Sequence, residues 1–366
     1  METYPIPMTP GPVRVPEAIR DAHRTDYGVP GMEPEFFALY ERCEAALGTL
    51  LGTRGRVAIL TGEGMLALWA ALKSCLKPGD RVLSVATGVF GYGIAEMARS
   101  IGADVRTIGL GYDETIGEAC LREVETALKI GDYRMITAVH CETPSGTLNP
   151  LAGLGVLKKK YGVPLFYADV VSSMGGAPVL ADEWGIDLAL GGSQKCLSMP
   201  PSLSFVSVSD AAWARIEAVG YVGYDALLPF RDAVANRRFP YTPYWHGLAA
   251  LAAAADSLLA EGLEAAFERH RRTADRCREG LAALGVSRFP RPEAVSSPTV
   301  TASRVPEGWE WPAFDRRLRE KGLAVGGSHG PMAGKVFRMG HMGSQADIGL
   351  VDRALGVLKT VLRDGP

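Results

Sequence analysis

Pro164-Leu165-Phe166-Tyr167-Ala168-Asp169 is a short apolar stretch that ends in an acidic residue. Further stretches of the same kind occur before and after it, at Val57–Leu60, Arg81–Val85, Ala103–Ile108, Met135–Val139 and Ser204–Val208. Their apolar character is continuous rather than alternating, which is typical of strands in a sheet covered on both faces. Segments with helical spacing, such as Met65–Leu76 and Ile94–Ile101, lie between them. This alternation predicts βαβ units and a mostly parallel sheet, and so a fold of the α/β class.

The composition is that of an ordinary soluble globular protein, with 47% hydrophobic and 22% charged residues. A chain of 366 residues can form one large and one smaller domain. The formal net charge is −2 and the sequence has no long basic run. We therefore expect neither a nucleic-acid partner nor binding to a charged membrane surface.

The segment Met1–Pro5 is not followed by the apolar core of a signal peptide, and no apolar stretch reaches the ~18–20 residues that span a bilayer. The six cysteines are scattered without Cys-x-x-Cys spacing. This pattern is typical of buried thiols in a reducing cytosol rather than of a disulfide framework or a zinc site. A cytoplasmic protein without a metal site is expected.

The chain is predicted to divide into an N-terminal arm (residues 1–15), a large domain (residues 16–243) and a small α+β domain (residues 244–366). The pattern in the last region predicts, in order, a helix at Gly247–Leu259, a charged helix ending near Glu279, a strand at Ser297–Thr301, a helix at Trp311–Lys321, a strand into Arg338 and a closing helix at Ala346–Leu362.

Lys195 follows Asp169 by 26 residues, at the end of the loop Gly191-Gly192-Ser193-Gln194-Lys195. An acidic side chain at the end of an apolar run can keep a pyridine nitrogen protonated. A lysine on a tight glycine-serine loop can form a Schiff base with an aldehyde. Taken singly, the two residues are more simply a strand-end cap and a surface lysine. Taken together, they predict the protein's half of pyridoxal chemistry.

Thr61-Gly62-Glu63-Gly64-Met65 joins a predicted strand to a predicted helix, so its backbone N–H groups can face a ligand. The same glycines also suit a tight turn without a ligand. Glu63 would repel a phosphate dianion by about 3 kcal/mol per pair of unit charges at ~5 Å and an effective dielectric constant of ~20.

Three further positions suit a small-molecule site, although each also has a structural explanation. Phe90 stands at a strand-to-helix junction, where it can stack on a ring or pack in the core. The turn His140–Gly146 contains Thr143, which can bond a ring oxygen or only its own turn. Arg338, among apolar residues and glycines, needs a carboxylate from a substrate or from the protein.

From Thr9-Pro10-Gly11-Pro12 to Arg338-Met339-Gly340-His341-Met342-Gly343, these motifs resemble the class V branch of the fold-type I pyridoxal-phosphate aminotransferases. The resemblance implies a large domain with a mostly parallel seven-stranded-type sheet, a smaller α+β domain, and a homodimer or tetramer with sites at a subunit interface. It also implies roles for five residues: Schiff-base formation by Lys195, pairing with the pyridine nitrogen by Asp169, ring stacking by Phe90, a bond to the phenolic oxygen or to the Asp169 network by Thr143, and substrate-carboxylate binding by Arg338.

The likeness also identifies the loop that would hold the cofactor's phosphate. The family usually has a small hydroxyl residue where Glu63 stands, and often a threonine or histidine where Met65 stands. The positions that the resemblance leaves for the cofactor around this loop are Glu63, Gly64, Met65, Ser193, Gln194 and, from the partner subunit, Tyr241 and Thr242.

Within the branch the chain most resembles the pyridoxamine–pyruvate transaminases, which use phosphate-free pyridoxamine or pyridoxal as a substrate. The shared features are the glutamate at position 63, the stretch Thr143-Pro144-Ser145-Gly146-Thr147 and the stretch that begins at Arg338. Phe90 replaces a tyrosine, and His329 stands where that subgroup has a second arginine for the substrate carboxylate. The resemblance implies amino transfer between the ring and a small 2-oxo acid such as pyruvate, with alanine as its amino partner, and a bond from Glu63 to the 5′-hydroxymethyl group.

Three alternatives remain open at this stage. One is an alanine– or serine–glyoxylate type aminotransferase with bound pyridoxal 5′-phosphate, in which Glu63 turns away. Another is a lyase of the same fold, related to cysteine desulfurases or kynureninases. Desulfurases need a nucleophilic cysteine on a mobile loop, and no cysteine follows Cys277. The third is an inactive binding protein, which the presence of Lys195, Asp169 and Arg338 disfavours.

Overall fold

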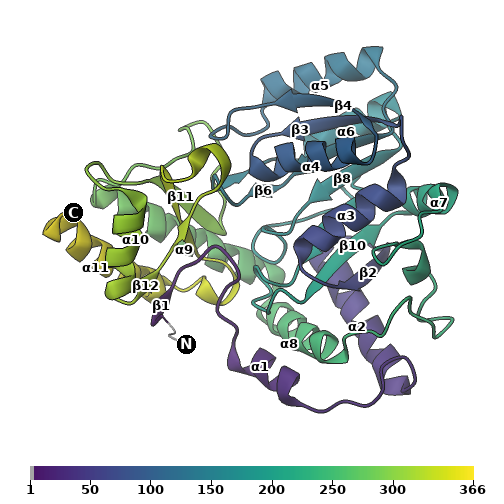
Figure 1. The fold of residues 1–366 in the computed structure, drawn as a ribbon, viewed down its shortest axis with the longest axis horizontal. Coiled ribbons are helices and arrows are strands. Elements are labelled where there is room, and N and C mark those ends of the chain that lie inside the picture. Colours follow the sequence, from purple (N-terminus) through teal and green to yellow (C-terminus); the bar gives the residue numbers. More distant parts are fainter. Residues whose placement is uncertain (1–3) are drawn as a thin grey trace.

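A seven-stranded sheet forms the centre of the large domain in the computed structural model, which describes residues 4–366 (Figure 1). In spatial order its strands are β2 (Arg56–Thr61), β10 (Leu203–Val208), β9 (Leu188–Gly192), β8 (Leu165–Asp169), β5 (Met135–Val139), β3 (Arg81–Ala86) and β4 (Asp104–Gly109). Neighbouring strands are parallel except where β10 pairs with β2 and β9. The predicted mostly parallel sheet is thereby confirmed.

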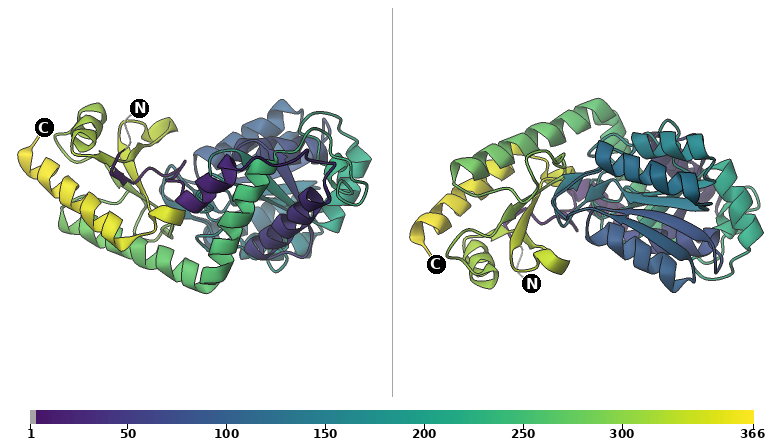
Figure 2. Two further views of the ribbon diagram at one scale, coloured as in Figure 1. Left: turned by 90° about the horizontal axis from the view of Figure 1, so that it is seen from below. Right: turned by 90° about the horizontal axis from the view of Figure 1, so that it is seen from above.

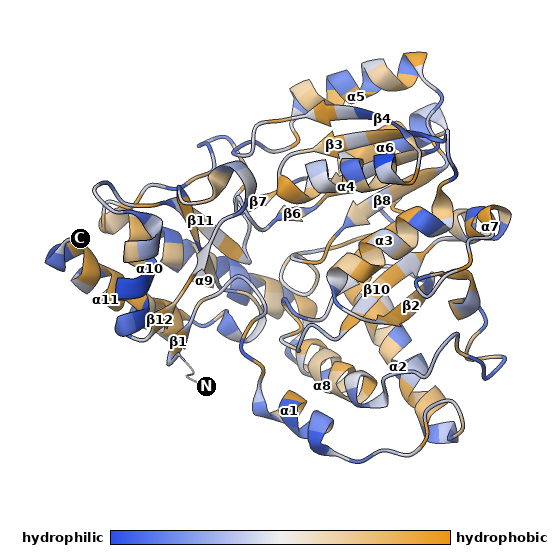
Figure 3. Cartoon of the chain, in the orientation of Figure 1, coloured by the Kyte–Doolittle hydropathy of each residue, from blue (hydrophilic) through white to orange (hydrophobic). Residues whose placement is uncertain are grey.

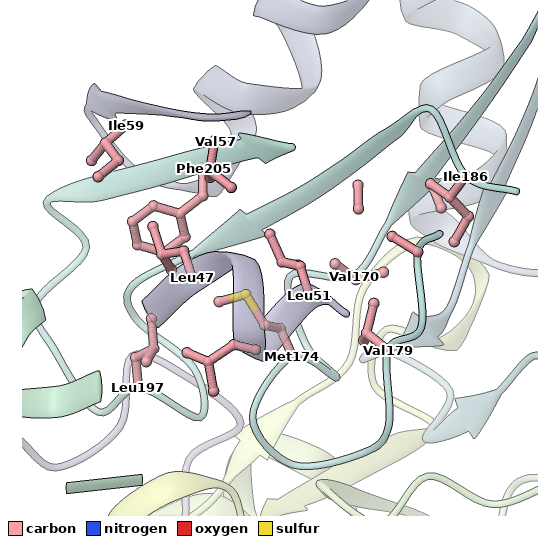
Figure 4. Close-up of a cluster of buried hydrophobic side chains, with 14 of the residues drawn as sticks. Leu47, Leu51, Val57, Ile59, Val170, Met174, Val179, Ile186, Leu197 and Phe205 are labelled. Atoms are coloured by element: carbon pink, nitrogen blue, oxygen red, sulfur yellow. The ribbon is translucent and has the colours of Figure 1, made fainter. Parts of the chain in front are cut away.

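Helices cover both faces of this sheet (Figure 2). One face packs against α2 (Pro34–Leu51), α5 (Glu118–Ile130), α6 (Ala152–Tyr161) and α8 (Trp245–Glu261), and the other against α3 (Gly64–Cys75), α4 (Val89–Ser100) and α7 (Asp210–Val219). Alternate strand residues enter opposite cores, as β2 shows: Val57 and Ile59 join one cluster (Figure 4), while Ala58 and Leu60 join the other. Double coverage explains why the strand sequences are continuously apolar.

The small domain has its own core under a three-stranded antiparallel sheet of β11 (Val300–Arg304), β14 (Val336–Gly340) and β13 (Gly326–Gly327). Its helices are α9 (Leu263–Ala283), α10 (Trp311–Glu320) and α11 (Ile348–Asp364). Helices on the outside of the molecule, such as α5, carry both hydrophilic and hydrophobic residues, as Figure 3 shows. No helix within residues 4–366 is both long and apolar enough to cross a bilayer.

Short elements connect the two domains. The N-terminal arm contributes β1 (Ile6–Pro7), which pairs in parallel with β12 (Leu323–Ala324) of the small domain. Helix α1 (Glu17–Arg24) then leads into the large domain, and the hairpin β6 (Cys141–Glu142) and β7 (Thr147–Leu148) follows β5. The arm therefore runs from the small domain to the large one.

One sequence prediction about the fold needs correction, and one strand was not predicted. Helix α8 was assigned to the small domain, but Leu248, Leu251 and Leu258 pack in the same core cluster as Leu47 of α2. By packing, the boundary lies near Gly262, between α8 and α9. Strand β9 was not predicted, because it ends in two glycines that disfavour a strand locally, whereas pairing with β8 and β10 on its two sides forms it in the folded chain.

Candidate active site

The loops that follow five strands meet at the carboxyl edge of the large sheet, where open α/β sheets bind ligands. They carry the sequence-predicted residues, in the order Glu63 after β2, Phe90 after β3, Thr143 after β5, Asp169 at the end of β8 and Lys195 after β9. Most of the predicted residues are therefore brought to one edge of the sheet by its topology.

Lys195 is mostly buried, and its Nζ donates a hydrogen bond to the carbonyl oxygen of Pro10 at 2.6 Å. Burial, together with the positive charge of Arg338, lowers the pKa of this amine to about 8. About a tenth of Lys195 is then a neutral amine at pH 7, and the neutral amine is the form that acts as a nucleophile or a base.

The N-terminal arm lies directly on this lysine. Gly11 has a φ of +94°, and a Cβ at this position would lie 2.6 Å from both Cδ and Nζ of Lys195. Only glycine combines that backbone conformation with such a close approach. The buried amide of Gln345 donates to the carbonyl of Thr9 at 2.9 Å and holds the arm in place. Sequence reasoning missed Gln345, because nothing local marks a residue whose partners lie 336 positions away.

Asp169 is 5% exposed, and its Oδ1 accepts a hydrogen bond from the backbone N–H of Val171 at 2.9 Å. Burial, together with the nearby charge of Glu63, raises the pKa of this carboxyl to about 6, against the opposing effects of the Val171 N–H and Lys195. A cationic N–H group placed against Asp169 would favour its ionised form.

Glu63 contacts the loop that carries Lys195. It is the N-cap residue of α3, with Oε1 accepting from the backbone N–H of Met65 at 3.0 Å and Oε2 accepting from Nε2 of Gln194 at 3.2 Å. Its carboxylate therefore occupies the positive end of the helix, where an anionic ligand group would otherwise bind. Gly64 is buried beside Gln194, where a Cβ would lie 3.4 Å from Nε2.

Gln194 itself has an unsatisfied group. Its Nε2 donates to Glu63, while its Oε1 is buried and has no hydrogen-bond partner within residues 4–366. Since a carboxylate can only accept, the bond to Glu63 fixes which end of the amide is the donor. The free acceptor at Oε1 is suited to a ligand hydroxyl.

The hydroxyl of Ser193, which was predicted to serve a phosphate, is bonded within its own loop. Its buried hydroxyl donates to the carbonyl of Pro200 at 2.6 Å and accepts the N–H groups of Ser202 at 3.2 Å and Leu203 at 3.1 Å. These bonds use its full capacity, so Ser193 shapes the lysine loop.

Tyr241 and Thr242 were predicted to reach into the site of a partner subunit. In the structure the Tyr241 hydroxyl accepts the backbone N–H of Thr61 in its own chain at 3.1 Å. The Tyr241 ring stacks on Tyr224 with a centroid distance of 4.4 Å, and Thr242 is exposed. Aromatic packing thus holds Tyr241 beside the Glu63 loop of its own chain, and a contact of Tyr241 or Thr242 with a partner subunit stays a prediction.

Phe90 is partly buried in the first turn of α4, where a second glutamate meets it. The carboxylate of Glu142 is fully buried and accepts the backbone N–H groups of Phe90 at 3.1 Å and Gly91 at 2.7 Å. Burial raises the pKa of Glu142 to about 7. The hydroxyl of neighbouring Thr143 bonds that of Ser172 at 2.5 Å, in the loop that follows Asp169. The sequence marked position 142 only as the acid of a turn.

Arg338 is 7% exposed on β14, and its Nε and Nη2 both donate to the carbonyl of Gly327, at 2.8 and 2.5 Å. Nη2 lies 3.1 Å from Nε2 of His329, so the neutral imidazole accepts from the guanidinium. Burial lowers the pKa of Arg338 to about 10, and burial together with the charges of Arg338 and Lys195 lowers the pKa of His329. Within residues 4–366, Nη1 of Arg338 has no hydrogen-bond partner and is available to a carboxylate.

Comparison with known proteins shows which enzyme family this chain belongs to. The family model described as Aminotransferase class-V matches residues 12–342. The chain belongs to the class V aminotransferase family and is an aminotransferase, as the resemblance of its motifs predicted. This family membership implies pyridoxal 5′-phosphate as the cofactor.

The alignments with individual relatives extend over most of the chain. It is 33% identical to the pyridoxamine–pyruvate transaminase of Mesorhizobium japonicum, over 93% of this chain and 87% of that protein. It is also 33% identical to the L-aspartate–glyoxylate aminotransferase of Paracoccus denitrificans, over 92% of this chain and 86% of that protein. The crystal structure of a pyridoxamine–pyruvate aminotransferase from Mesorhizobium loti superposes with a TM-score of 0.94 at 30% identity, covering 99% of this chain and 93% of that one.

Proposed function

We propose that this aminotransferase moves an amino group between a phosphate-free pyridoxamine or pyridoxal ring and a small 2-oxo acid such as pyruvate. The observation that carries the proposal is the position of Glu63, whose carboxylate caps the N-terminus of α3 and faces Gln194. The likeness in sequence and in fold to enzymes named as pyridoxamine–pyruvate aminotransferase supports it.

Hydrogen-bond chemistry distinguishes the two forms of the ring. Glu63 Oε2 and the unpartnered Gln194 Oε1 are both acceptors. A hydroxymethyl group brings an O–H donor to such a place, whereas a phosphate dianion brings only acceptors and negative charge. The charge repulsion alone is about 3 kcal/mol at ~5 Å and an effective dielectric constant of ~20. The residues present therefore fit a pyridoxal ring with a 5′-hydroxyl better than one with a phosphate.

When bound, the ring supplies an electron sink for the bond that breaks at the Cα of the amino acid. We assign the proton transfers at that carbon to Lys195, whose pKa of about 8 leaves part of the amine unprotonated near neutral pH. Asp169 holds the proton of the ring nitrogen, because a buried carboxylate gains most from a cationic N–H partner. Phe90 stacks on the ring, and Thr143 lies beside the loop that carries Asp169.

The acid substrate is assigned to the other end of the site. Nη1 of Arg338 binds the substrate carboxylate, while the two bonds to Gly327 keep the guanidinium fixed. His329 lies beside Arg338 as a neutral acceptor and so adds no second positive charge. This arrangement suits a small acid with one carboxylate, such as pyruvate with alanine as its amino partner.

The second candidate is an aminotransferase of the alanine– or serine–glyoxylate type that keeps pyridoxal 5′-phosphate bound. The favouring observation is that Glu63 is partly exposed and held by only two hydrogen bonds, so rotating it away would free the Met65 N–H for a phosphate. A lyase of the desulfurase kind is disfavoured, since all six cysteines are buried thiols.

The test is an absorbance titration of cofactor-stripped protein with pyridoxal and, separately, with pyridoxal 5′-phosphate, each followed by alanine. Tight binding of pyridoxal, weak binding of the phosphate ester, and release of free pyridoxamine with pyruvate would support the proposal. Stoichiometric retention of the phosphate ester through gel filtration, with amino transfer between small acids, would establish the second candidate instead.

We also propose a homodimer, or a tetramer built from it. Apolar side chains are exposed on two loops of the large domain: Val29 and Met32 are 54% and 72% exposed, and Val222 and Tyr224 are 91% and 63% exposed. Exposed apolar groups of this size are typical of surfaces that are covered in an assembly. Light scattering coupled to size-exclusion chromatography tests this directly, and a monomeric mass at micromolar concentration would contradict it.

A further inference from the structure

We propose that Glu142 is a positioning residue that fixes the Phe90 platform on which the pyridoxal ring lies. The proposal rests on the stacking role proposed above for Phe90, and it does not depend on whether the ring carries a phosphate. Glu142 itself is fully buried and contacts the backbone of the platform rather than the ring.

The first support is the way in which α4 begins. The first N–H groups of any helix need partners from outside the helix. Gly88, the N-cap residue of α4, has no side chain that could supply one. Glu142 supplies both of its oxygens instead, one to the N–H of Phe90 and one to the N–H of Gly91. A carboxylate at the positive end of a helix is a strong anchor for these two residues.

The second support is that the backbone leaves room for this carboxylate. A Cβ at Gly88 would lie 2.5 Å from Cδ of Glu142. A Cβ at Gly91 would lie 2.9 Å from Cα of Ala86 and 3.2 Å from Oε1 of Glu142. Glycine at both positions lets the carboxylate approach the helix end from the hairpin β6–β7, which is 51 and 52 residues away in the chain.

The third support is that the same short segment also contacts the loop of Asp169. The backbone N–H of His140 donates to the carbonyl of Asp169 at 2.8 Å, and Thr143 bonds Ser172. Residues 140–143 therefore connect the residue proposed to stack on the ring with the residue proposed to bind its nitrogen. Glu142 sets the distance between these two elements by holding the end of α4 against this segment.

A double-mutant cycle tests whether Glu142 acts through Phe90. The variants are Glu142→Gln, Phe90→Ala and the double variant, and the measurement is the Kd of the stripped protein for pyridoxal and for pyridoxal 5′-phosphate. Glu142→Gln replaces one acceptor oxygen by an amide that repels a backbone N–H, and should raise both Kd values by about tenfold. In the Phe90→Ala background the same change should have less than a twofold effect. Multiplicative effects of the two substitutions would overturn the proposal.

A control separates positioning from general stability. Asp347 is exposed and caps α11 by accepting the N–H of Leu350 at 2.6 Å. Asp347→Asn should lower the Tm and leave both Kd values unchanged, and a matching rise in Kd would count against a specific role for Glu142. Should Glu142→Gln not fold, Glu142→Asp keeps the charge, reaches only one of the two N–H groups, and gives the same cycle with a smaller change in Kd.

The two ligands keep this result separate from the proposed function. A shared loss of affinity for pyridoxal and its phosphate ester supports Glu142 even if the wild-type protein prefers the ester. A loss for only one of them would contradict positioning of the ring by Phe90 and Glu142.

Discussion

Two glutamates cap neighbouring helices at the same edge of the sheet, and they do so in opposite ways. Glu63 is the N-cap residue of its own helix, α3, is partly exposed and bonds a residue two positions away. Glu142 caps α4 from a different strand and is fully buried. The local cap can respond to what binds beside it, whereas the distant cap is fixed by the fold around it.

This difference suggests different roles: recognition of the ligand for Glu63, and support of the site's backbone for Glu142. Glu63 lies where the 5′ group of the ring is proposed to bind, and its bond to Gln194 leaves an acceptor open to a ligand. Both oxygens of Glu142 are used within the protein. Changes at position 63 should therefore alter which ligand binds, while changes at position 142 should alter how well any ring is held.

The largest expected effect is the loss of amino transfer in a variant that lacks the Lys195 amine, whatever residues stand at positions 63 and 142. Lys195→Ala removes the amine assigned to proton transfer, and amino transfer from pyridoxamine to pyruvate should fall at least about a thousandfold. The measurement is the rate of pyruvate consumption at saturating pyridoxamine. This variant sets the floor against which variants at positions 63 and 142 are compared. Residual activity within tenfold of the wild type would remove Lys195 from the proposed chemistry.

The two caps should also differ in how much each contributes to the free energy of unfolding. Glu142→Ala leaves two buried backbone N–H groups without a partner and should lower the free energy of unfolding by about 2–4 kcal/mol. Glu63→Ala removes an N-cap that water can partly replace, at a cost of about 1 kcal/mol. Urea unfolding followed by circular dichroism measures both. Equal losses would mean that burial does not distinguish the two carboxylates.

A charge-neutral variant of the local cap sharpens the contrast in recognition. Glu63→Gln keeps the shape of the side chain and removes its charge, so binding of pyridoxal 5′-phosphate should tighten by up to about a hundredfold. Binding of pyridoxal should change by only a fewfold. Glu142→Gln, as the matched change, should weaken both ligands. An unchanged preference in Glu63→Gln would show that Glu63 does not face the 5′ group.

The smallest expected effect is a pH dependence of the stability that Glu142 contributes to the folded protein. Its pKa is raised from an ordinary value of 4.5 to about 7, so between these values the folded protein binds more protons than the unfolded chain. The stability contributed by Glu142 is then present below pH 4.5 and decreases as pH rises to about 7. The loss of stability caused by Glu142→Ala should accordingly be larger at pH 5 than at pH 8. Urea midpoints at the two pH values measure this, and a larger loss at pH 8 would contradict the expected direction.

The sequence predicted the parts of the site that depend on local pattern. Lys195 and Asp169 were found because each ends a recognisable segment, and the carboxyl ends of parallel strands meet at one edge. Arg338 was found because a lone arginine in an apolar stretch needs a partner. Strands β5 and β8 and helix α10 lie within a residue of their predicted bounds, since their apolar spacing agrees with the structure that tertiary contacts select.

The sequence was less informative where hydrogen-bond partners are distant along the chain. Ser193 was expected to face a ligand, yet it is saturated by the loop that follows it. The sequence also did not show that the Tyr241 hydroxyl accepts the N–H of Thr61, or that its ring stacks on Tyr224. Helix α8 belongs by packing to the large domain, which its alanine-rich sequence did not reveal.

The sequence by itself determined the α/β class and the order along the chain of the loops that follow the strands, because periodicity and residue type are local properties. It also predicted the residues that we propose for the pyridoxal chemistry. Only the tertiary structure decided that Glu63 faces Gln194, that Gly11 covers Lys195 and that Glu142 supports Phe90. These contacts join positions from 52 to 184 residues apart, and no local pattern encodes which distant partner will satisfy a buried polar group.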